Sequence, residues 1–163
     1  MAEGNLLKSL VSIKFCFYGG DKVMEKVTKE KQITVVMQNE TGTLAEITGV
    51  VADYGVNIEN VCAYTAGDVA VFHLLTNDNV KAINALEKKG YKVVETEVIV
   101  VHLWNRPGSL SAVAAKFRQH AIDLQYVYGT SSLMGEKMTI VFSAKDNDKA
   151  AEVFDSMVLE DTI

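Results

Sequence analysis

The amino-acid sequence predicts an α+β protein built from two copies of one βαββαβ module. The first observation is a repeated loop, because Asn39-Glu40-Thr41-Gly42-Thr43-Leu44 recurs at an offset of 66 residues as Asn105-Arg106-Pro107-Gly108-Ser109-Leu110. The second is the apolar register around the loop, which aligns Ile33, Val35 and Met37 with Ile99, Val101 and Leu103. A period of this size is longer than that of solenoid repeats and favours two duplicated small domains.

The periodicity of the first copy gives the order of its elements. Apolar residues at helical spacing predict a first helix, which Thr41 or Thr43 can cap and which Gly55 ends. Gly67-Asp68 is expected to form a hairpin turn, and Asn77 or Asp78 to cap the second helix. The expected strands are 32–38, 57–65, 69–75 and 91–94, and the expected helices are 41–54 and 78–86.

The second copy repeats this order except at its end. The expected strands are 98–104, 124–130 and 137–143, and the expected helices are 109–120 and 147–157. Only residues 158–163 remain for a fourth strand, and Glu160 and Asp161 make them polar, so we expect that strand to be short or absent. An unpaired sheet edge favours a substitute strand. Residues 11–18 alternate like a strand, and we expect them to pair with or dock on a sheet edge.

A second interpretation of the N-terminus stays open. Met24-Glu25-Lys26 resembles a natural start just before the first strand, in which case residues 1–23 are an artefact of annotation or cloning. The predicted organisation is therefore an N-terminal extension over residues 1–30, strand-like or artefactual, a first domain over 31–96 and a second over 97–163.

The order βαββαβ predicts a ferredoxin-like sandwich in each module, with an antiparallel sheet and two helices on one face. The other face of the sheet is also apolar, where a solvated face would be polar. We therefore expect a second sheet or the N-terminal segment to cover it. The residues on this face are Val36, Val69, Val71, His73, Leu75, Val98, Val100, His102 and Trp104.

Composition excludes several classes of protein. The chain has 163 residues, a hydrophobic fraction of 48% and a net charge of −5, and it has no basic nucleic-acid footprint. Cys16 and Cys62 are far apart without C-x-x-C spacing, which favours free thiols in a reducing compartment. No apolar run is long enough to cross a bilayer. We expect a cytoplasmic protein without nucleic-acid or membrane partners.

The repeated loop has the chemistry of an anion site. Gly42 and Gly108 permit positive φ angles and close backbone approach. The amides of the following helical turn have no intrahelical partners and point toward the loop, where they suit a carboxylate or phosphate. The alternative is a helix start that caps itself and needs no ligand.

These residues resemble the ACT domain family. The resemblance is carried by a strand, the pattern Asn-x-Thr/Pro-Gly-x-Leu, an amphipathic helix, and Gly55-Val56-Asn57-Ile58 before the next strand. It covers about residues 31–96 and 97–159, and Thr41 stands where proline is commoner in the family. The resemblance implies regulatory modules that bind small ligands, most often amino acids. It also implies pairing of the modules through their second strands into one eight-stranded antiparallel sheet with helices on one face.

The resemblance further implies where ligands bind, between the first loop of one module and the start of its partner's second strand. The loop amides would receive a carboxylate, and Asn57 or Asp123 an ammonium group. The first set of candidate ligand-binding residues is Asn39, Glu40, Thr41, Gly42, Thr43, Leu44, Asn57 and Ile58. The second set is Asn105, Arg106, Pro107, Gly108, Ser109, Leu110, Asp123 and Leu124. The sets differ at Glu40/Arg106 and Asn57/Asp123, so we expect unequal affinities.

No reactive constellation accompanies these loops. His73 and His102 fall within expected strands and His120 ends a helix, so we interpret all three as structural or surface residues. No nucleophile elbow or diagnostic pair of carboxylates is present. We therefore expect no catalytic residues, no metal and no cofactor.

The leading hypothesis is a non-catalytic, tandem ACT regulatory protein that binds an amino acid or similar small metabolite. We expect a homodimer or higher homo-oligomer, with a separate enzyme as a possible partner. The alternative is a regulatory or assembly subunit of an amino-acid-metabolising enzyme that needs no ligand itself.

Overall fold

The computed structural model describes residues 24–160, with side chains to residue 154. Residues 11–18, for which we predicted a strand, lie outside this range, as does the question of whether residues 1–23 are native. The strands are β1 (Met24–Gln38), β2 (Ile58–Ala66), β3 (Val69–Thr76), β4 (Val93–Trp104), β5 (Leu124–Thr130) and β6 (Lys137–Ala144). The helices are α1 (Thr43–Asp53), α2 (Asn79–Lys88), α3 (Ser109–Gln119) and α4 (Asn147–Glu160).

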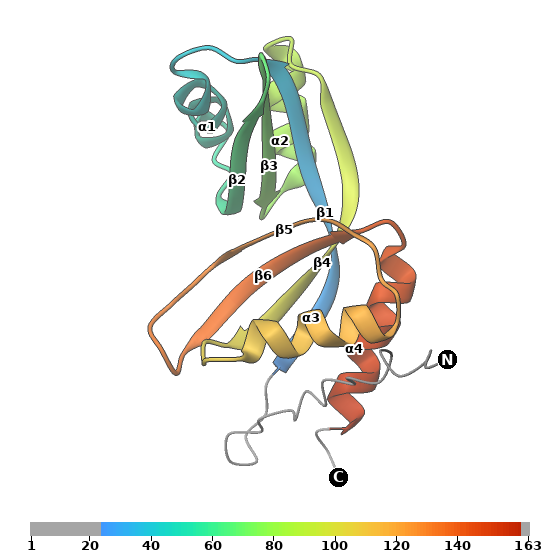
Figure 1. Cartoon of the computed structure of the whole chain (residues 1–163). Coiled ribbons are helices and arrows are strands. Elements are labelled where there is room, and N and C mark those ends of the chain that lie inside the picture. The colour runs from blue at the N-terminus through green and yellow to red at the C-terminus, as the bar shows by residue number, and fades with distance from the viewer. Residues whose placement is uncertain (1–23, 161–163) are drawn as a thin grey trace, which may run out of the picture.

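All six strands form one antiparallel sheet in the order β2-β3-β1-β4-β6-β5 (Figure 1). Its two central strands, β1 and β4, are long and pair from Met24 opposite Leu103 to Val35 opposite Val93. The C-terminal half of β1 pairs with β3, and the C-terminal half of β4 pairs with β6. Each central strand therefore belongs to both modules.

The shared strands complete the second module. Residues 158–160 continue α4, so the second copy ends in a helix where the first copy has a strand, as its sequence led us to expect. The edge left open beside β4 is filled by the N-terminal half of β1, with Val27 opposite Val101 and Lys29 opposite Ile99. The substitute strand thus comes from residues immediately before the first predicted strand.

The predicted eight-stranded sheet is not formed by residues 24–160, whose sheet has six strands. Two separate modules of four strands would give eight, but here β1 and β4 each supply one strand to both modules. The modules consequently pair through β1 and β4 at the centre of the sheet, whereas their second strands, β2 and β5, lie at its two ends and do not pair as the resemblance implied.

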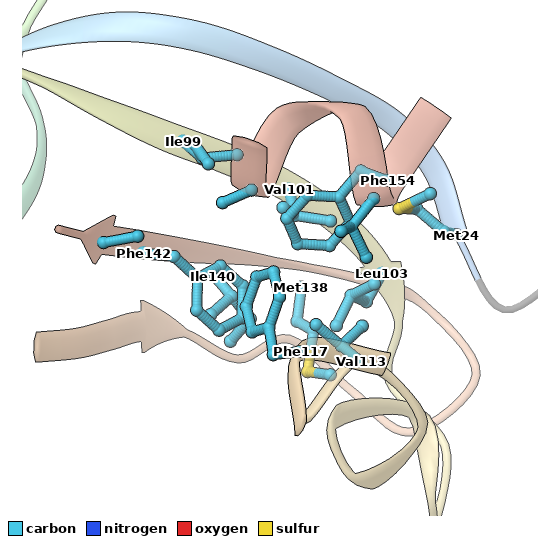
Figure 2. Packing of buried hydrophobic residues seen from close by; sticks show 13 residues of the cluster. Met24, Ile99, Val101, Leu103, Val113, Phe117, Met138, Ile140, Phe142 and Phe154 are labelled. Atoms are coloured by element: carbon cyan, nitrogen blue, oxygen red, sulfur yellow. The ribbon is translucent and has the colours of Figure 1, made fainter. Parts of the chain in front are cut away.

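Two hydrophobic cores lie between the sheet and the helices, one for each module. The first contains Ile33 and Val35 of β1 with Ile47 of α1 and Leu86 of α2. Figure 2 shows the second, in which Phe117, Phe142 and Phe154 pack edge to face or tilted with ring centroids 5.0–5.9 Å apart. Met24 of β1 is buried in this second core next to Phe154 of α4. The first strand of the chain is thus part of both cores.

A belt of polar side chains separates the two cores on the helix face. Lys29 pairs with Glu97 at 3.1 Å and Lys31 with Glu95 at 3.0 Å, across the β1–β4 ladder. These pairs explain why the Glu95-Thr96-Glu97 segment is a continuous part of β4, although its polarity predicted a break between two strands. Each acidic side chain meets a lysine of the neighbouring strand, which favours the pairing of the two strands.

The opposite face of the sheet curls onto itself. Leu75, Val98, Val100 and Val141 form a small buried cluster there, against which Tyr128 packs. The expectation that this apolar face is covered is confirmed for Val98, Val100, His73 and Leu75, all at most 4% exposed, while Val36 and Val69 remain 47% and 38% exposed. The cover comes from the other half of the same sheet. A hydrogen bond of 2.9 Å from the Thr130 hydroxyl to Asn60 Oδ1 joins its outermost strands, β5 and β2.

Candidate functional site

Both repeated loops end in a glycine with a left-handed backbone. Gly42 precedes α1 with φ 96°, and Gly108 precedes α3 with φ 91°. L-amino acids rarely adopt this conformation, so the glycines are required by the backbone turn. A Cβ at either position would meet no atom within 4 Å, and the constraint is therefore conformational and not one of space.

The two helices that follow these loops have no side-chain cap. We predicted that Thr41 or Thr43 caps α1, and this is wrong, because the Thr43 hydroxyl donates instead to the carbonyl oxygen of Glu40 at 2.7 Å. The other two helices are capped normally. Asp78 accepts a hydrogen bond from the Lys81 amide at 3.1 Å, and Asp146 accepts one from the Lys149 amide at 2.9 Å.

The amides of Thr43 and Ser109, the first residues of α1 and α3, donate to the carbonyls of Glu40 and Arg106 at 3.4 and 3.2 Å. The next two amides of each helix, at residues 44–45 and 110–111, are left available to a ligand because glycine supplies no side-chain cap. The N-terminal turn of a helix has unpaired N–H groups and a partial positive charge, and both favour an anion. The first residues of the two helices, Thr43 and Ser109, are buried, whereas the second residues, Leu44 and Leu110, are 49% and 44% exposed. These two places can chemically accept a carboxylate.

The remaining candidates lie away from the loop of their own module. Ile58 begins β2 and Leu124 begins β5, and Asn57 and Asp123 each lie one residue before, after the end of the first helix of their module. An 11-residue helix is about 16 Å long. The loop and the second-strand start of one module therefore sit at opposite ends of a helix. In Figure 1 the loop before α1 is at the top and the loop before α3 at the lower left, so the two loops are also far apart.

Asn57 and Asp123 have different surroundings. The backbone of Asn57 is paired with Asn77, because the Asn57 amide donates to Asn77 Oδ1 at 2.9 Å and the Asn77 amide donates to the Asn57 carbonyl at 3.1 Å. In the second module Lys145 stands where Asn77 does. Its amide keeps the bond to the Asp123 carbonyl, at 2.9 Å, but its side chain has no oxygen to accept the Asp123 amide.

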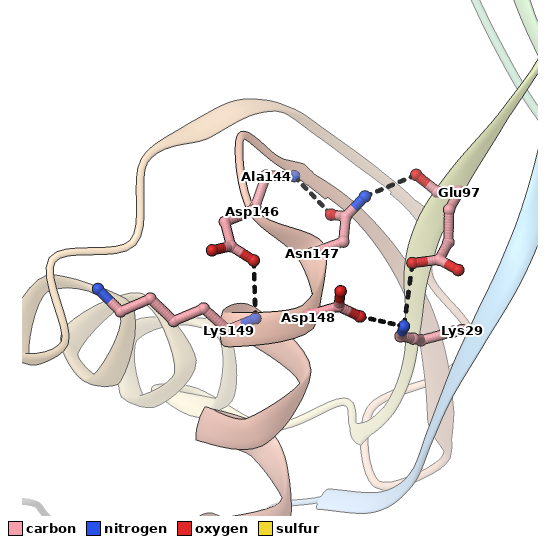
Figure 3. A network of polar contacts seen from close by, with 7 residues as sticks. All are labelled: Lys29, Glu97, Ala144, Asp146, Asn147, Asp148 and Lys149. Carbon is pink, nitrogen blue, oxygen red and sulfur yellow. Dashed lines mark hydrogen bonds and ion pairs between the residues drawn. The ribbon is translucent and has the colours of Figure 1, made fainter.

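A groove of about 640 Å³ opens beside Asp123, which the sequence did not predict. It is lined by residues 121–123 between α3 and β5, by residues 145–149 at the β6–α4 connection and the start of α4, and by Glu97 of β4. Figure 3 shows the polar network along it, in which Asn147 donates to the Glu97 carbonyl at 2.7 Å and Lys29 contacts both Glu97 and Asp148. The hydrogen bonds that Lys29 donates to the carboxylates of Asp148 and Glu97 raise the pKa of its ammonium group. None of the residues 105–110 lines the groove, so it joins Asp123 to α4 and not to the repeated loop.

The histidines have structural surroundings in agreement with their predicted role. Nδ1 of His73 lies 2.9 Å from Gln32 Nε2 and 3.0 Å from the Thr34 hydroxyl, and His102 Nδ1 lies 3.1 Å from the Thr139 hydroxyl. His120 caps the C-terminus of α3. Within the described range, no group of three or more His, Cys, Asp or Glu side chains has the arrangement of a metal site. No helix among residues 24–160 is long and apolar enough to span a membrane.

Comparison with protein families agrees with this geometry. The family model described as an ACT domain pair matches residues 28–161, nearly the whole chain. The chain therefore belongs to the ACT domain pair family, and the resemblance found in the repeated loops is confirmed. No curated protein sequence matches it.

Solved structures share the fold. Protein BT0572 from Bacteroides thetaiotaomicron is 25% identical with a TM-score of 0.74, over 80% of this chain and 89% of that one. The ligand-free regulatory subunit of aspartate kinase from Thermus thermophilus is 12% identical with a TM-score of 0.59, over 83% of this chain and 99% of that one. The corresponding subunit from Thermus flavus is 12% identical with a TM-score of 0.56, over 84% and 99%. The ACT pair fold is thus shared along almost the full length of these proteins.

Proposed function

We propose that this ACT pair is a non-catalytic regulatory protein that binds an amino acid or a similar small carboxylate at the starts of α1 and α3. One observation carries the proposal. Among the four helices of residues 24–160, the two that follow the repeated loop lack a side-chain cap, whereas Asp78 and Asp146 cap the other two. The loop therefore leaves donor groups open at both equivalent positions.

The chemistry of the site follows from these donors. The free amides of the first helical turn would bind the carboxylate, and the loop side chains Asn39, Thr41 and Arg106 would add short polar contacts. The ammonium group needs an acceptor, for which Asn57 or Asp123 is suited. Since each lies a helix length from the loop of its own module, we propose that a second copy of the chain supplies it. The complete site is then formed in a homodimer.

The relatives support an assignment to amino-acid metabolism without naming the ligand. The aspartate kinase regulatory subunits of two Thermus species have the same fold. A regulatory output through a separate enzyme is accordingly part of the proposal.

A second candidate function is a regulatory or assembly subunit that binds its enzyme without a ligand. Its support is the outer edge of the sheet, where Val61 of β2 and Val127 of β5 occupy equivalent positions and are 49% and 48% exposed. Unpaired edge strands with exposed apolar side chains favour association with another chain. Co-purification with an enzyme, without any thermal response to amino acids, would favour this second candidate.

A thermal-shift screen over the common amino acids and related metabolites tests the leading proposal. We expect at least one to raise the melting temperature, and Gly42→Ala and Gly108→Ala to reduce the response, because alanine is strained at these φ angles. Gly49→Ala is the matched control, since it lies inside α1 with no atom within 4 Å of the added Cβ. An undiminished response in both loop variants would show that the loops are not the site.

A further inference from the structure

The second repeated loop is bound by an adjacent hairpin of its own module. Residues 131–136 connect β5 to β6, and the side-chain amide of Asn105 donates to the Ser131 hydroxyl at 3.0 Å and to the Ser132 carbonyl at 2.6 Å. The Asn105 carbonyl also accepts a bond from the Gly135 amide at 2.9 Å. Both N–H groups of this side chain are thus used inside the protein.

The first module has no such contact. Its β2 and β3 are joined by only Gly67 and Asp68, and the Asn39 amide donates to the Asp68 carbonyl at 2.9 Å. The same backbone bond occurs in the second module, from Asn105 to Glu136 at 2.7 Å, so this part of the loop is common to both. The Asn39 side chain is exposed, and among the described residues it has no hydrogen-bond partner. Asn105, by contrast, is half-buried.

The longer hairpin is an independent small turn that projects from the sheet. It closes through a bond of 3.0 Å from the Glu136 amide to the Leu133 carbonyl, with Gly135 at φ 89°. Its tip is exposed, with Leu133 at 74% and Met134 at 79%. Since Leu133 and Met134 are largely exposed, the hairpin contacts the loop through its hydrogen bonds to Asn105.

We infer that the hairpin of residues 131–136 is a built-in cover that engages Asn105 and so directs ligand binding to the first loop. The inference rests on the function proposed above and assigns unequal roles to its two sites. A ligand at the first loop finds the side-chain amide of Asn39 without a partner among the described residues. A ligand at the second loop must either forgo the amide of Asn105 or break its bonds to Ser131 and Ser132, which lowers affinity.

Hydrogen exchange measured by mass spectrometry tests the cover without any ligand. In Asn105→Ala we expect exchange of the amides of residues 131–136 to rise about tenfold, the effect of losing two side-chain hydrogen bonds. Asn39→Ala is the matched control and should leave the turn at Gly67 and Asp68 unchanged. Asn105→Asp, which is nearly isosteric but cannot donate to the Ser132 carbonyl, gives a second variant in case the alanine variant does not fold. Unchanged exchange of the hairpin in both Asn105 variants would overturn the inference.

An amide NMR titration with the common amino acids, added one at a time, tests whether ligand binding is directed to the first loop. In the unmodified chain we expect shifts at Leu44 and Ala45 and none at Leu110 and Ser111, while Asn105→Ala should gain shifts at Leu110. Equal shifts at both loops in the unmodified chain would overturn the cover alone and leave the proposed function intact. No shift at either loop in any variant would overturn the directing role together with the proposed function.

Discussion

The side-chain amide of Gln32 lies 2.9 Å from Nδ1 of His73 at the centre of the curled sheet. Gln32 is fully buried, and its Nε2 also donates to the Tyr126 hydroxyl at 2.8 Å while its Oε1 accepts from the Tyr128 hydroxyl at 2.7 Å. The ring of His73 stacks on that of Tyr126 with a centroid distance of 4.5 Å. One residue of β1 therefore links β3 of the first module to β5 of the second.

Replacing Gln32 should destabilise the whole chain. Gln32→Leu keeps the size of the side chain but removes the partner of the Tyr126 and Tyr128 hydroxyls and leaves Nδ1 of His73 with the Thr34 hydroxyl alone. We expect the free energy of unfolding to fall by about 2–4 kcal/mol, since buried polar groups that lose their partner are costly. Urea unfolding followed by circular dichroism measures this loss.

Gln38→Leu is the control for this variant, because Gln38 is exposed at the end of the same strand. We expect its free energy of unfolding to stay within about 0.5 kcal/mol of the unmodified chain. Equal values for the Gln32 and Gln38 variants would show that the central network does not contribute to stability.

The buried His73 should make the protein less stable in mild acid. Burial lowers the pKa of His73 from the ordinary value of 6.5. The side chains that contact its ring are those of Gln32, Thr34, Tyr64, Tyr126 and Tyr128. As the pH falls through 6.5 the unfolded chain therefore takes up this proton before the folded chain does, and the free energy of unfolding falls with falling pH until His73 is also protonated in the folded chain.

The slope of stability against pH, measured by urea unfolding between neutral and mildly acidic solution, checks this effect. In His73→Gln we expect the free energy of unfolding to depend less steeply on pH, because this histidine no longer contributes. This holds even if the substitution changes the stability at neutral pH. His120→Gln, a change at the exposed end of α3, should leave the slope as it is. An unchanged slope in the His73 variant would contradict the prediction.

The shared strand predicts that a change near the start of β1 weakens the second module. Met24 is 1% exposed and packs in the core of that module, although it begins the first strand of the chain. We expect Met24→Ala to lower the free energy of unfolding by about 2–4 kcal/mol. Hydrogen exchange should rise in β4 and β6 more than in β3. Lys26→Ala, on the exposed side of the same strand, is the control, and equal effects of both changes would refute the shared-strand role.

Much of the fold could be predicted because apolar periodicity marks the elements that face a core. The second-module strand at Leu124–Thr130 and the start of α3 at Ser109 were predicted at their observed positions. The N-terminal half of β1 was missed, because Glu25, Lys26, Lys29 and Glu30 make it polar and only Met24 and Val27 supply apolar side chains. Its partners were not visible in the sequence, since the pairing of Lys29 with Glu97 depends on a contact between distant segments.

The candidate site was predicted in part for a similar reason. Glycine in a loop before a helix indicates a positive φ, and both Gly42 and Gly108 have one. The absence of a side-chain cap could not be predicted, because Thr43 has the chemistry of a cap but bonds to Glu40. The engagement of Asn105 by the hairpin was also missed. A sequence signal existed, namely the two extra residues of the second copy near Leu133, but nothing in it showed that they fold back on the loop.

The central claim is that the uncapped helix starts bind a carboxylate. The most direct measurement is an amide NMR titration with the amino acid that gives the largest thermal shift, beside the matching amine that lacks the carboxyl group. We predict that the amino acid shifts the amides of Leu44 and Ala45 and that the amine leaves them unchanged. Equal shifts from both compounds, or shifts that leave the first turns of α1 and α3 untouched, would contradict the account.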